Sequence, residues 1–142
     1  MKIRNILLVF FVMVVTAIAA CSKGGVAAEE EHVQQDFSDT THPVIDIRNP
    51  GDNQVFASGD IIKVQGKVTD NALYQGSIRI KDDANEAVAK EQLYEIHFYQ
   101  SYDFSIEYKA TVTKTTNYTV TVQFEDHGTN VTSKSVKVKV NP

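Results

Sequence analysis

Cys21 is the only cysteine in the chain, and the residues before it follow an ordered pattern. Lys2 and Arg4 give a short positive start, an apolar run follows over residues 6–15, and small residues lead up to the thiol. The apolar run is too short to cross a hydrocarbon core of about 30 Å comfortably as a helix. A positive start, a short apolar run and small residues in this order are typical of a secretory signal peptide. The sequence therefore predicts export, with residues 1–20 removed.

The four residues Ile18-Ala19-Ala20-Cys21 resemble the lipobox of bacterial lipoproteins. In that family the cysteine thiol receives a diacylglycerol, a signal peptidase cuts ahead of the cysteine, and the cysteine becomes the acylated N-terminus. The resemblance implies a palmitate-bearing membrane anchor on Cys21. Ser22 then favours the outer membrane, by the sorting rule of enteric bacteria. The alternative is an ordinary secretory signal with an incidental cysteine.

Oxygen ligands recur at one end of the predicted domain. Asp70 and Asn71 follow one predicted strand and Asp126 follows another, and both strands end on the same side. Calcium takes six to eight oxygens from such carboxylates and amides. Asp and Asn are also ordinary turn residues, because their side chains hydrogen-bond the nearby backbone. We favour the turn interpretation and keep a calcium site as the alternative; no cofactor is predicted.

Three tyrosines, Tyr74, Tyr99 and Tyr102, lie around the predicted third and fourth strands. Exposed tyrosines offer a flat apolar face and a polar tip, which suit stacking on a sugar or anchoring a protein partner. They are equally common as strand fillers. Thr40 lies in Asp39-Thr40-Thr41, which resembles a short O-glycosylation site used in some Gram-negative groups.

Charge and motifs exclude several functions. The net charge of −4 becomes −6 once Lys2 and Arg4 leave with the signal peptide. An acidic chain without a basic cluster argues against nucleic acid as a partner. No nucleophile elbow, zinc-protease motif or phosphate-binding glycine loop occurs, so we predict that the protein is not an enzyme.

The mature chain divides into a tether and one domain. Residues 21–42 are small, acidic and polar without an apolar period, which predicts a disordered tether. From residue 43 to 142 apolar residues alternate with polar ones, as in half-buried strands. Turn signals separate the strands, and the stretch 86–93 is expected to be a single turn or a loop. The seven predicted strands cover residues 45–47, 62–68, 78–80, 94–98, 104–112, 118–124 and 136–140. They predict an all-β, antiparallel two-sheet sandwich.

The segment from Pro43 to Asn71, with its Asn-Pro-Gly and Gly-Asp turns, resembles the opening of bacterial immunoglobulin-like domains. The stretch 117–140 is similar to their last hairpin, and Tyr118 stands where such sandwiches have a tyrosine corner. The likeness is greatest to a family of Gram-negative lipoproteins of unknown function, and the paired cysteines and core tryptophan of antibody domains are missing. We therefore expect a non-catalytic envelope module that binds a protein or a glycan. A structural spacer without a ligand is the alternative.

Overall fold

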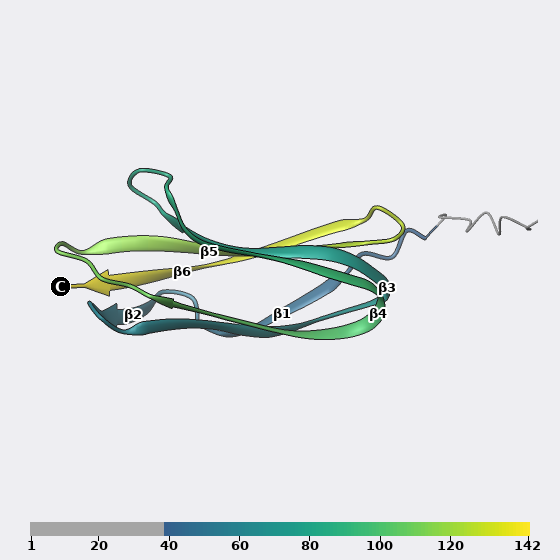
Figure 1. The fold of residues 1–142 in the computed structure, drawn as a ribbon, viewed down its shortest axis with the longest axis horizontal. Helices are drawn as coiled ribbons and strands as arrows, with labels where there is room; N and C mark the ends of the chain where they lie inside the picture. The colour runs from purple at the N-terminus through teal and green to yellow at the C-terminus, as the bar shows by residue number, and fades with distance from the viewer. Residues whose placement is uncertain (1–38) are drawn as a thin grey trace, which may run out of the picture. The chain divides into compact units, whose positions relative to one another are not determined.

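The structure is a computed structural model in which residues 39–142 are described. The predictions on the signal peptide, on Cys21 and on residues 21–38 of the tether lie outside this part of the chain. The described residues form six strands and no helix, and hence no helix that could span a membrane. The prediction of an all-β domain is confirmed. The strands are β1 (Val44–Asn49), β2 (Gln54–Ala57), β3 (Ile61–Asp82), β4 (Val88–Lys109), β5 (Thr116–Asp126) and β6 (Val131–Asn141) (Figure 1).

The alternating pattern produces strands with one buried face. In β5, Tyr118, Val120, Val122 and Phe124 are buried, and the residues between them are half-buried or exposed. Successive side chains of a strand point to opposite faces, so the apolar set lies on one side. This confirms the predicted register of β5.

β3 and β4 are each 22 residues long and each replaces two predicted strands. The turn predicted at residues 70–71 and the break predicted between the strands 94–98 and 104–112 are therefore wrong, because the chain continues there as a strand. The pairing of β3 with β4 shifts register between Thr69 and Leu73. The strands bend at this point without reversing, since β4 stays paired beside β3 on either side of the shift. The loop expected over residues 86–93 is also wrong, because β4 begins at Val88.

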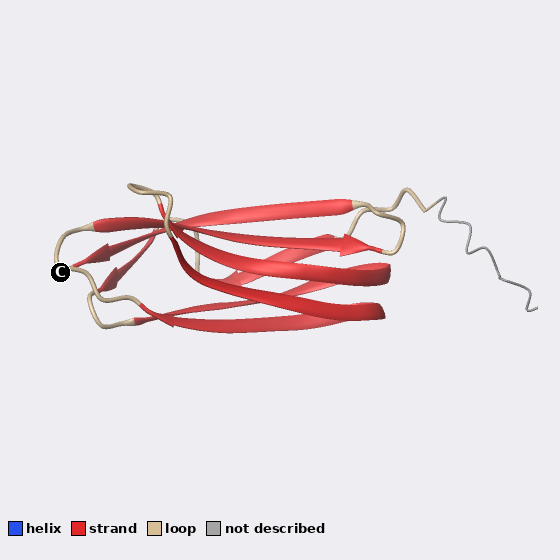
Figure 2. Cartoon of the chain, turned by 45° about the horizontal axis from the view of Figure 1, so that its top comes forward, coloured by secondary structure: helices blue, strands red, loops and turns tan. Residues whose placement is uncertain are grey.

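The strands form one curled, mixed sheet in the order β1-β3-β5-β6-β2, with β4 on the other edge of β3. The first half of β3 pairs with β1 and the second half with β5, all antiparallel. β2, which the sequence did not predict, runs parallel to β6. Because β3 changes partner halfway, the sheet curls and encloses one face (Figures 1 and 2).

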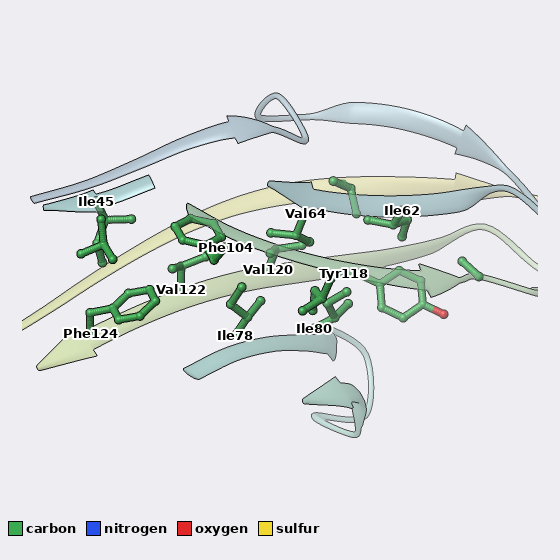
Figure 3. Close-up of a cluster of buried hydrophobic side chains, with 14 of the residues drawn as sticks. Ile45, Ile62, Val64, Ile78, Ile80, Phe104, Tyr118, Val120, Val122 and Phe124 are labelled. Atoms are coloured by element: carbon green, nitrogen blue, oxygen red, sulfur yellow. The ribbon is translucent and has the colours of Figure 1, made fainter. Parts of the chain in front are cut away.

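The enclosed face holds a single apolar core. Side chains from β1, β3, β4, β5 and β6 meet there (Figure 3), and Ile62, Val64, Val120 and Phe124 among them are fully buried. Figure 3 shows the rings of Phe104 and Phe124 pointing into this space.

Two glycines of β3 admit these rings. Gly66 lies opposite Phe104 on β4, and Gly76 lies opposite Phe124 on β5. A Cβ atom at either glycine would overlap the ring of its partner phenylalanine. The glycines therefore let a large ring lie flat over the backbone of β3.

Tyr118 meets the tyrosine-corner prediction in part. Its ring is buried, and it packs edge-on against Tyr108 with centroids 5.9 Å apart. Burial, with Tyr108 beside it, raises the pKa of Tyr118 to about 12. Within the described residues its hydroxyl forms no hydrogen bond to the backbone between β4 and β5. The ring therefore fills the predicted place, while the hydroxyl does not fasten the loop.

Candidate functional site

The loops gather at two ends of the domain (Figure 2). We call one of them the entry end, because the described chain begins there; it comprises residues 39–43, the bends of β3 and β4 at residues 70–74 and 97–101, and the β5–β6 turn at residues 127–130. The far end comprises the β3–β4 turn at residues 83–87, the β4–β5 connection at residues 110–115 and the last residues of β6. The two ends carry different chemistry.

Three carboxylates converge at the entry end. Asp39, Asp70 and Asp126 each offer one oxygen, and these oxygens all lie within 4.8 Å of one another. Asp126 at the end of β5 is only 1% exposed, whereas Asp39 and Asp70 are half-buried. Two of the three predicted oxygen ligands thus meet. The third, Asn71, is exposed, and Asp39 takes its place in the cluster.

Asn130 connects this carboxylate cluster to the start of the described chain. Its backbone N–H donates to Asp126 Oδ1 (2.8 Å), and its Nδ2 donates to Asp126 Oδ2 (2.9 Å) and to the backbone oxygen of Asp39 (2.8 Å). Gly128 permits this close approach, since a Cβ there would lie 2.9 Å from the Asp39 carbonyl oxygen. Asp39 is therefore held against the β5–β6 turn, although it lies four residues ahead of the predicted domain boundary at residue 43.

The charges of the cluster are not balanced by a basic side chain. None of the ion pairs among residues 39–142 includes Asp39, Asp70 or Asp126. Asp70 Oδ1 accepts from the N–H of Ala72 (3.0 Å), but Asp70 Oδ2 is buried without a hydrogen-bond partner. The Thr41 N–H is the main cause that lowers the pKa of Asp39, so this carboxyl is charged at neutral pH.

A cation would relieve the repulsion between these carboxylates. Two unit charges 4.8 Å apart repel by about 3.5 kcal/mol at the effective dielectric constant of about 20 that suits a protein surface. Calcium binds oxygens at about 2.3–2.6 Å, so two ligands on opposite sides of one ion lie about 4.8 Å apart. The three oxygens are close enough together to share one such ion.

An aromatic and histidine cluster lies beside the carboxylates. The rings of Tyr74 and His97 have centroids 4.8 Å apart, and those of His97 and His127 are 5.5 Å apart. Phe98 stacks on His127 at 4.0 Å with an angle of 6° between the planes. His127 follows Asp126 directly, so this cluster and the carboxylate cluster share the β5–β6 turn. Sequence reasoning missed this convergence, because the two histidines are thirty positions apart, one on β4 and the other in the β5–β6 turn.

The three candidate tyrosines do not form one surface. Tyr99 is 57% exposed, whereas Tyr74 and Tyr102 are half-buried. Tyr102 packs edge-on against Tyr94 with centroids 5.6 Å apart. Tyr94 in turn packs against the core. Only Tyr99 therefore presents an open ring to a ligand.

Thr40 is exposed next to the carboxylate cluster. Its exposure leaves room for a glycan, and its glycosylation stays a prediction. The lipidation of Cys21 also stays a prediction, because this residue lies outside the described part of the chain.

The far end contains a polar hollow of about 500 Å³. The β3–β4 turn contributes Asp82, Asp83 and Asn85, and the β4–β5 connection contributes Lys114 and Thr115. A second hollow, of about 290 Å³, shares Asp83 and Asn117 with the first. Apart from the turn residues themselves, no sequence pattern predicted either hollow.

The polar groups of the far end are fixed by hydrogen bonds. Asp83 Oδ1 accepts from the Thr119 hydroxyl (2.6 Å), and the Asp83 N–H donates to the Asn117 carbonyl (3.0 Å). Asp82 and Asn85 accept from backbone N–H groups within their own turn. The hollow therefore presents carboxylate, amide and ammonium groups on a rigid frame.

Comparison with known proteins adds little to this geometry. No family model matches the sequence, and neither does any curated protein. Among solved structures the chain is similar to an engineered protein, with 17% identity over 71% of this chain and 20% of that chain, at a TM-score of 0.49. It is also similar to the CARDB domain of a Pyrococcus furiosus protein in complex with di-metal ions, with 13% identity over 72% of this chain and 96% of that chain, at a TM-score of 0.40. Both TM-scores are low, so neither likeness bears on ligand or activity.

Proposed function

We propose that the protein is a lipid-anchored, non-catalytic immunoglobulin-like module of the bacterial cell envelope. A lipid on Cys21 holds it to a membrane, which we propose to be the outer membrane. The domain binds a partner at its far end. The single observation that carries the partner proposal is the pre-formed polar hollow there. The lipobox-like residues before Cys21 support the anchor.

The pairing of the strands supports the immunoglobulin-like assignment. If β3 and β4 are each divided at their bends, β1 lies beside the first half of β3, which lies beside the second half of β4. The other side consists, in this order, of β2, β6, β5, the second half of β3 and the first half of β4. These two sets correspond to the two sheets of an immunoglobulin-type sandwich, with the bends of β3 and β4 as the crossings between them.

The far end is suited to a hydroxyl-rich or polar partner. Carboxylate and amide oxygens accept hydrogen bonds from sugar hydroxyls, and the Lys114 ammonium donates to their oxygens. Because the hydrogen bonds inside the turn already fix Asp82 and Asn85, binding there immobilises few further side chains. We therefore propose a glycan, or a polar protein loop, as the partner.

Reversal of one charge tests the partner proposal. Lys114 is exposed, and its side chain makes no ion pair among the described residues, so Lys114→Glu leaves the fold intact. On a glycan array and in capture from envelope extracts, Lys114→Glu should weaken binding at least about tenfold, by analogy with the loss of a charged hydrogen bond. Lys90→Glu, on β4 away from the hollow, is the matched control and should bind normally. If neither wild type nor control binds anything, the spacer interpretation replaces the partner.

The anchor has its own test. Cys21→Ser removes the thiol that accepts the diacylglycerol, so the variant should stay an unprocessed precursor without radiolabelled palmitate. Palmitate incorporated into Cys21→Ser at the level of the wild type would contradict the anchor.

The second candidate function is a calcium site that stabilises the entry end. The specific observation in its favour is that Asp39 joins Asp70 and Asp126, while Asp70 Oδ2 is buried without a partner. The site would hold residue 39, and so the end of the tether, on the domain. With three protein carboxylates, the affinity is expected to be in the millimolar range of extracellular calcium modules.

Thermal unfolding in EDTA and in calcium tests this site. At 10 mM calcium and a Kd of about 1 mM, binding should stabilise the fold by about 1.4 kcal/mol, or several degrees in Tm for a domain of this size. Asp70→Asn should abolish the shift. Glu95→Gln, which removes an exposed carboxylate of β4 outside the cluster, should retain it. Equal Tm values for the wild type in EDTA and in calcium would rule out the calcium site.

A further inference from the structure

Phe98 and Tyr99 form an exposed aromatic pair at the entry end. Their side chains are 56% and 57% exposed. Every other phenylalanine and tyrosine within residues 39–142 is buried or half-buried. Val44 at the start of β1 and Val131 at the start of β6 are also exposed, at 65% and 45%. The entry end thus presents apolar side chains from three strands.

Phe98 lies in an unusual backbone conformation. Its φ is +62°, in the left-handed region that bulky L-residues rarely adopt. One face of its ring stacks on His127, and most of the remaining side chain is in solvent. The fold therefore holds a large apolar ring outward at a backbone position that disfavours it. Such strain is often found where a residue serves a function outside the packed core.

We infer that this aromatic pair docks the domain on the surface of the lipid bilayer to which the chain is anchored, an inference that rests on the proposed lipid at Cys21. The position of the pair favours a bilayer over a protein partner. Asp39 lies at the same end, and only residues 22–38 separate it from Cys21. If these residues form the tether that the sequence predicts, its root-mean-square reach is about 20–25 Å, and the pair is within reach of the anchoring membrane.

The chemistry of this surface fits the interfacial layer of a bilayer. Amphipathic aromatic rings such as that of tyrosine prefer the level of the lipid head groups, and Tyr99 is exposed beside Phe98, whose ring stacks on the half-buried His127. The nearby carboxylates Asp39, Asp70 and Asp126 disfavour an anionic surface. The expected target is therefore a zwitterionic bilayer, in which only the ring of Phe98 and the ring of Tyr99 enter.

The absence of tryptophan from the chain makes the test direct. Lipidated Phe98→Trp is reconstituted in phosphatidylcholine vesicles, and Trp fluorescence is recorded with and without lipids brominated near the head group. Val88→Trp, at a position 50% exposed near the far end, is the matched control. We expect a blue-shifted, bromine-quenched emission for Phe98→Trp and a water-exposed, unquenched emission for Val88→Trp. Vesicles rich in phosphatidylglycerol, in EDTA, should give a smaller shift for Phe98→Trp.

Flotation of the same vesicles separates the two proposals. If Phe98→Trp floats with the vesicles but its emission matches that of Val88→Trp, the anchor stands and the docking is overturned. If addition of envelope proteins, and not of lipid, shifts the emission of Phe98→Trp, the pair binds a protein and the bilayer inference is wrong. If the protein does not float, the anchor fails and the docking inference falls with it.

Discussion

The two ends of the domain present polar groups in opposite ways. At the far end, Asp83 is hydrogen-bonded by Thr119 and lies within 3.6 Å of Lys137 Nζ, so its charge is compensated. At the entry end, the three carboxylates lie close together without a basic partner, and one buried oxygen of Asp70 has no donor. The charge of Asp83 at the far end is thus compensated within the chain, whereas no ion pair among residues 39–142 includes a carboxylate of the entry-end cluster.

This difference indicates where the domain depends on its surroundings. The stability of a polar surface whose charges are already compensated depends little on cations or protons in the solution. An uncompensated carboxylate cluster makes the stability of its segment depend on the solution, because a cation or a proton offsets the repulsion. The entry end is also where residue 39 is held by Asn130, so the attachment of the tether depends on the same conditions.

The largest expected effect tests the shared core on which both ends rest. Val64 and Val120 are fully buried, so Val64→Ala and Val120→Ala should each lower the free energy of unfolding by about 1–3 kcal/mol through lost burial and a cavity. Thr121→Ala and Lys63→Ala, on the other face, should change it by about 0.5 kcal/mol or less. Urea unfolding measures all four. Similar losses for the inward and outward pairs would contradict the register of β3 and β5.

A glycine substitution distinguishes the tight entry end from a looser turn. A Cβ at Gly128 would lie 2.9 Å from the Asp39 carbonyl oxygen and 3.2 Å from Asp126 Oδ1, so Gly128→Ala should destabilise the fold by about 1–2 kcal/mol as the backbone shifts. In the β1–β2 turn, the nearest atom to a Cβ at Gly51 is 4.0 Å away, and Gly51→Ala should be within about 0.5 kcal/mol of wild type. Thermal unfolding of the two variants compares them. A benign Gly128→Ala would show that residue 39 is not held against the β5–β6 turn.

The sequence predicted the strands better than their connections. Period-two alternation fixes which face of a strand is buried, and it was right for β5 and for the core residues of β3. Whether a chain bends or turns at Asp70-Asn71 depends on its neighbours, and here β4 continues beside β3 past the bend. The short β2 was missed, because it pairs in parallel with the distant β6 and is mostly exposed.

The same reasoning found part of the candidate site. Asp70 and Asp126 were singled out because strand topology brings their strands to one end. The sequence predicts Asp39 to lie in the tether, because its segment has no apolar period. In the structure Asp39 joins the cluster through the side chain of Asn130. No local sequence pattern predicts this contact. Phe98 and His127 are likewise brought together only by the bend of β4.

A neutral substitution at Asp70 sharpens the contrast in charge between the ends. In EDTA, Asp70→Asn removes one charge from the cluster and should raise the free energy of unfolding by about 0.5–1 kcal/mol, a fraction of the Coulomb repulsion because solvent screens it. Asp83→Asn at the far end removes a compensated charge and should lower it by a similar amount. Urea unfolding in EDTA at pH 7 gives both values. Destabilisation by Asp70→Asn would mean that the cluster is not repulsive without metal.

The smallest effect concerns two tyrosines of the core, the half-buried Tyr94 and the buried Tyr118. Tyr94 lies opposite Gly76 and packs on Phe124, and its hydroxyl is buried without a hydrogen-bond partner; Tyr118 lies beside Tyr108. Tyr94→Phe should therefore stabilise the fold by up to about 1 kcal/mol at pH 7, because an unsatisfied polar group is removed. Tyr118→Phe should cost about 0.5 kcal/mol or less, since its hydroxyl fastens no backbone.

Burial is the main cause that raises the pKa of each tyrosine to about 12. A pKa raised above the ordinary value of 10 means that the folded state favours the neutral phenol, so ionisation of either tyrosine leaves the stability of the fold unchanged below pH 10 and lowers it as the pH rises through about 12. Urea unfolding between pH 8 and pH 12 should show this loss in the wild type, a smaller loss in either single variant and the smallest in the double variant. An alkaline loss of equal size in all four proteins would assign it to lysines, and would contradict burial as the cause of the two raised pKa values.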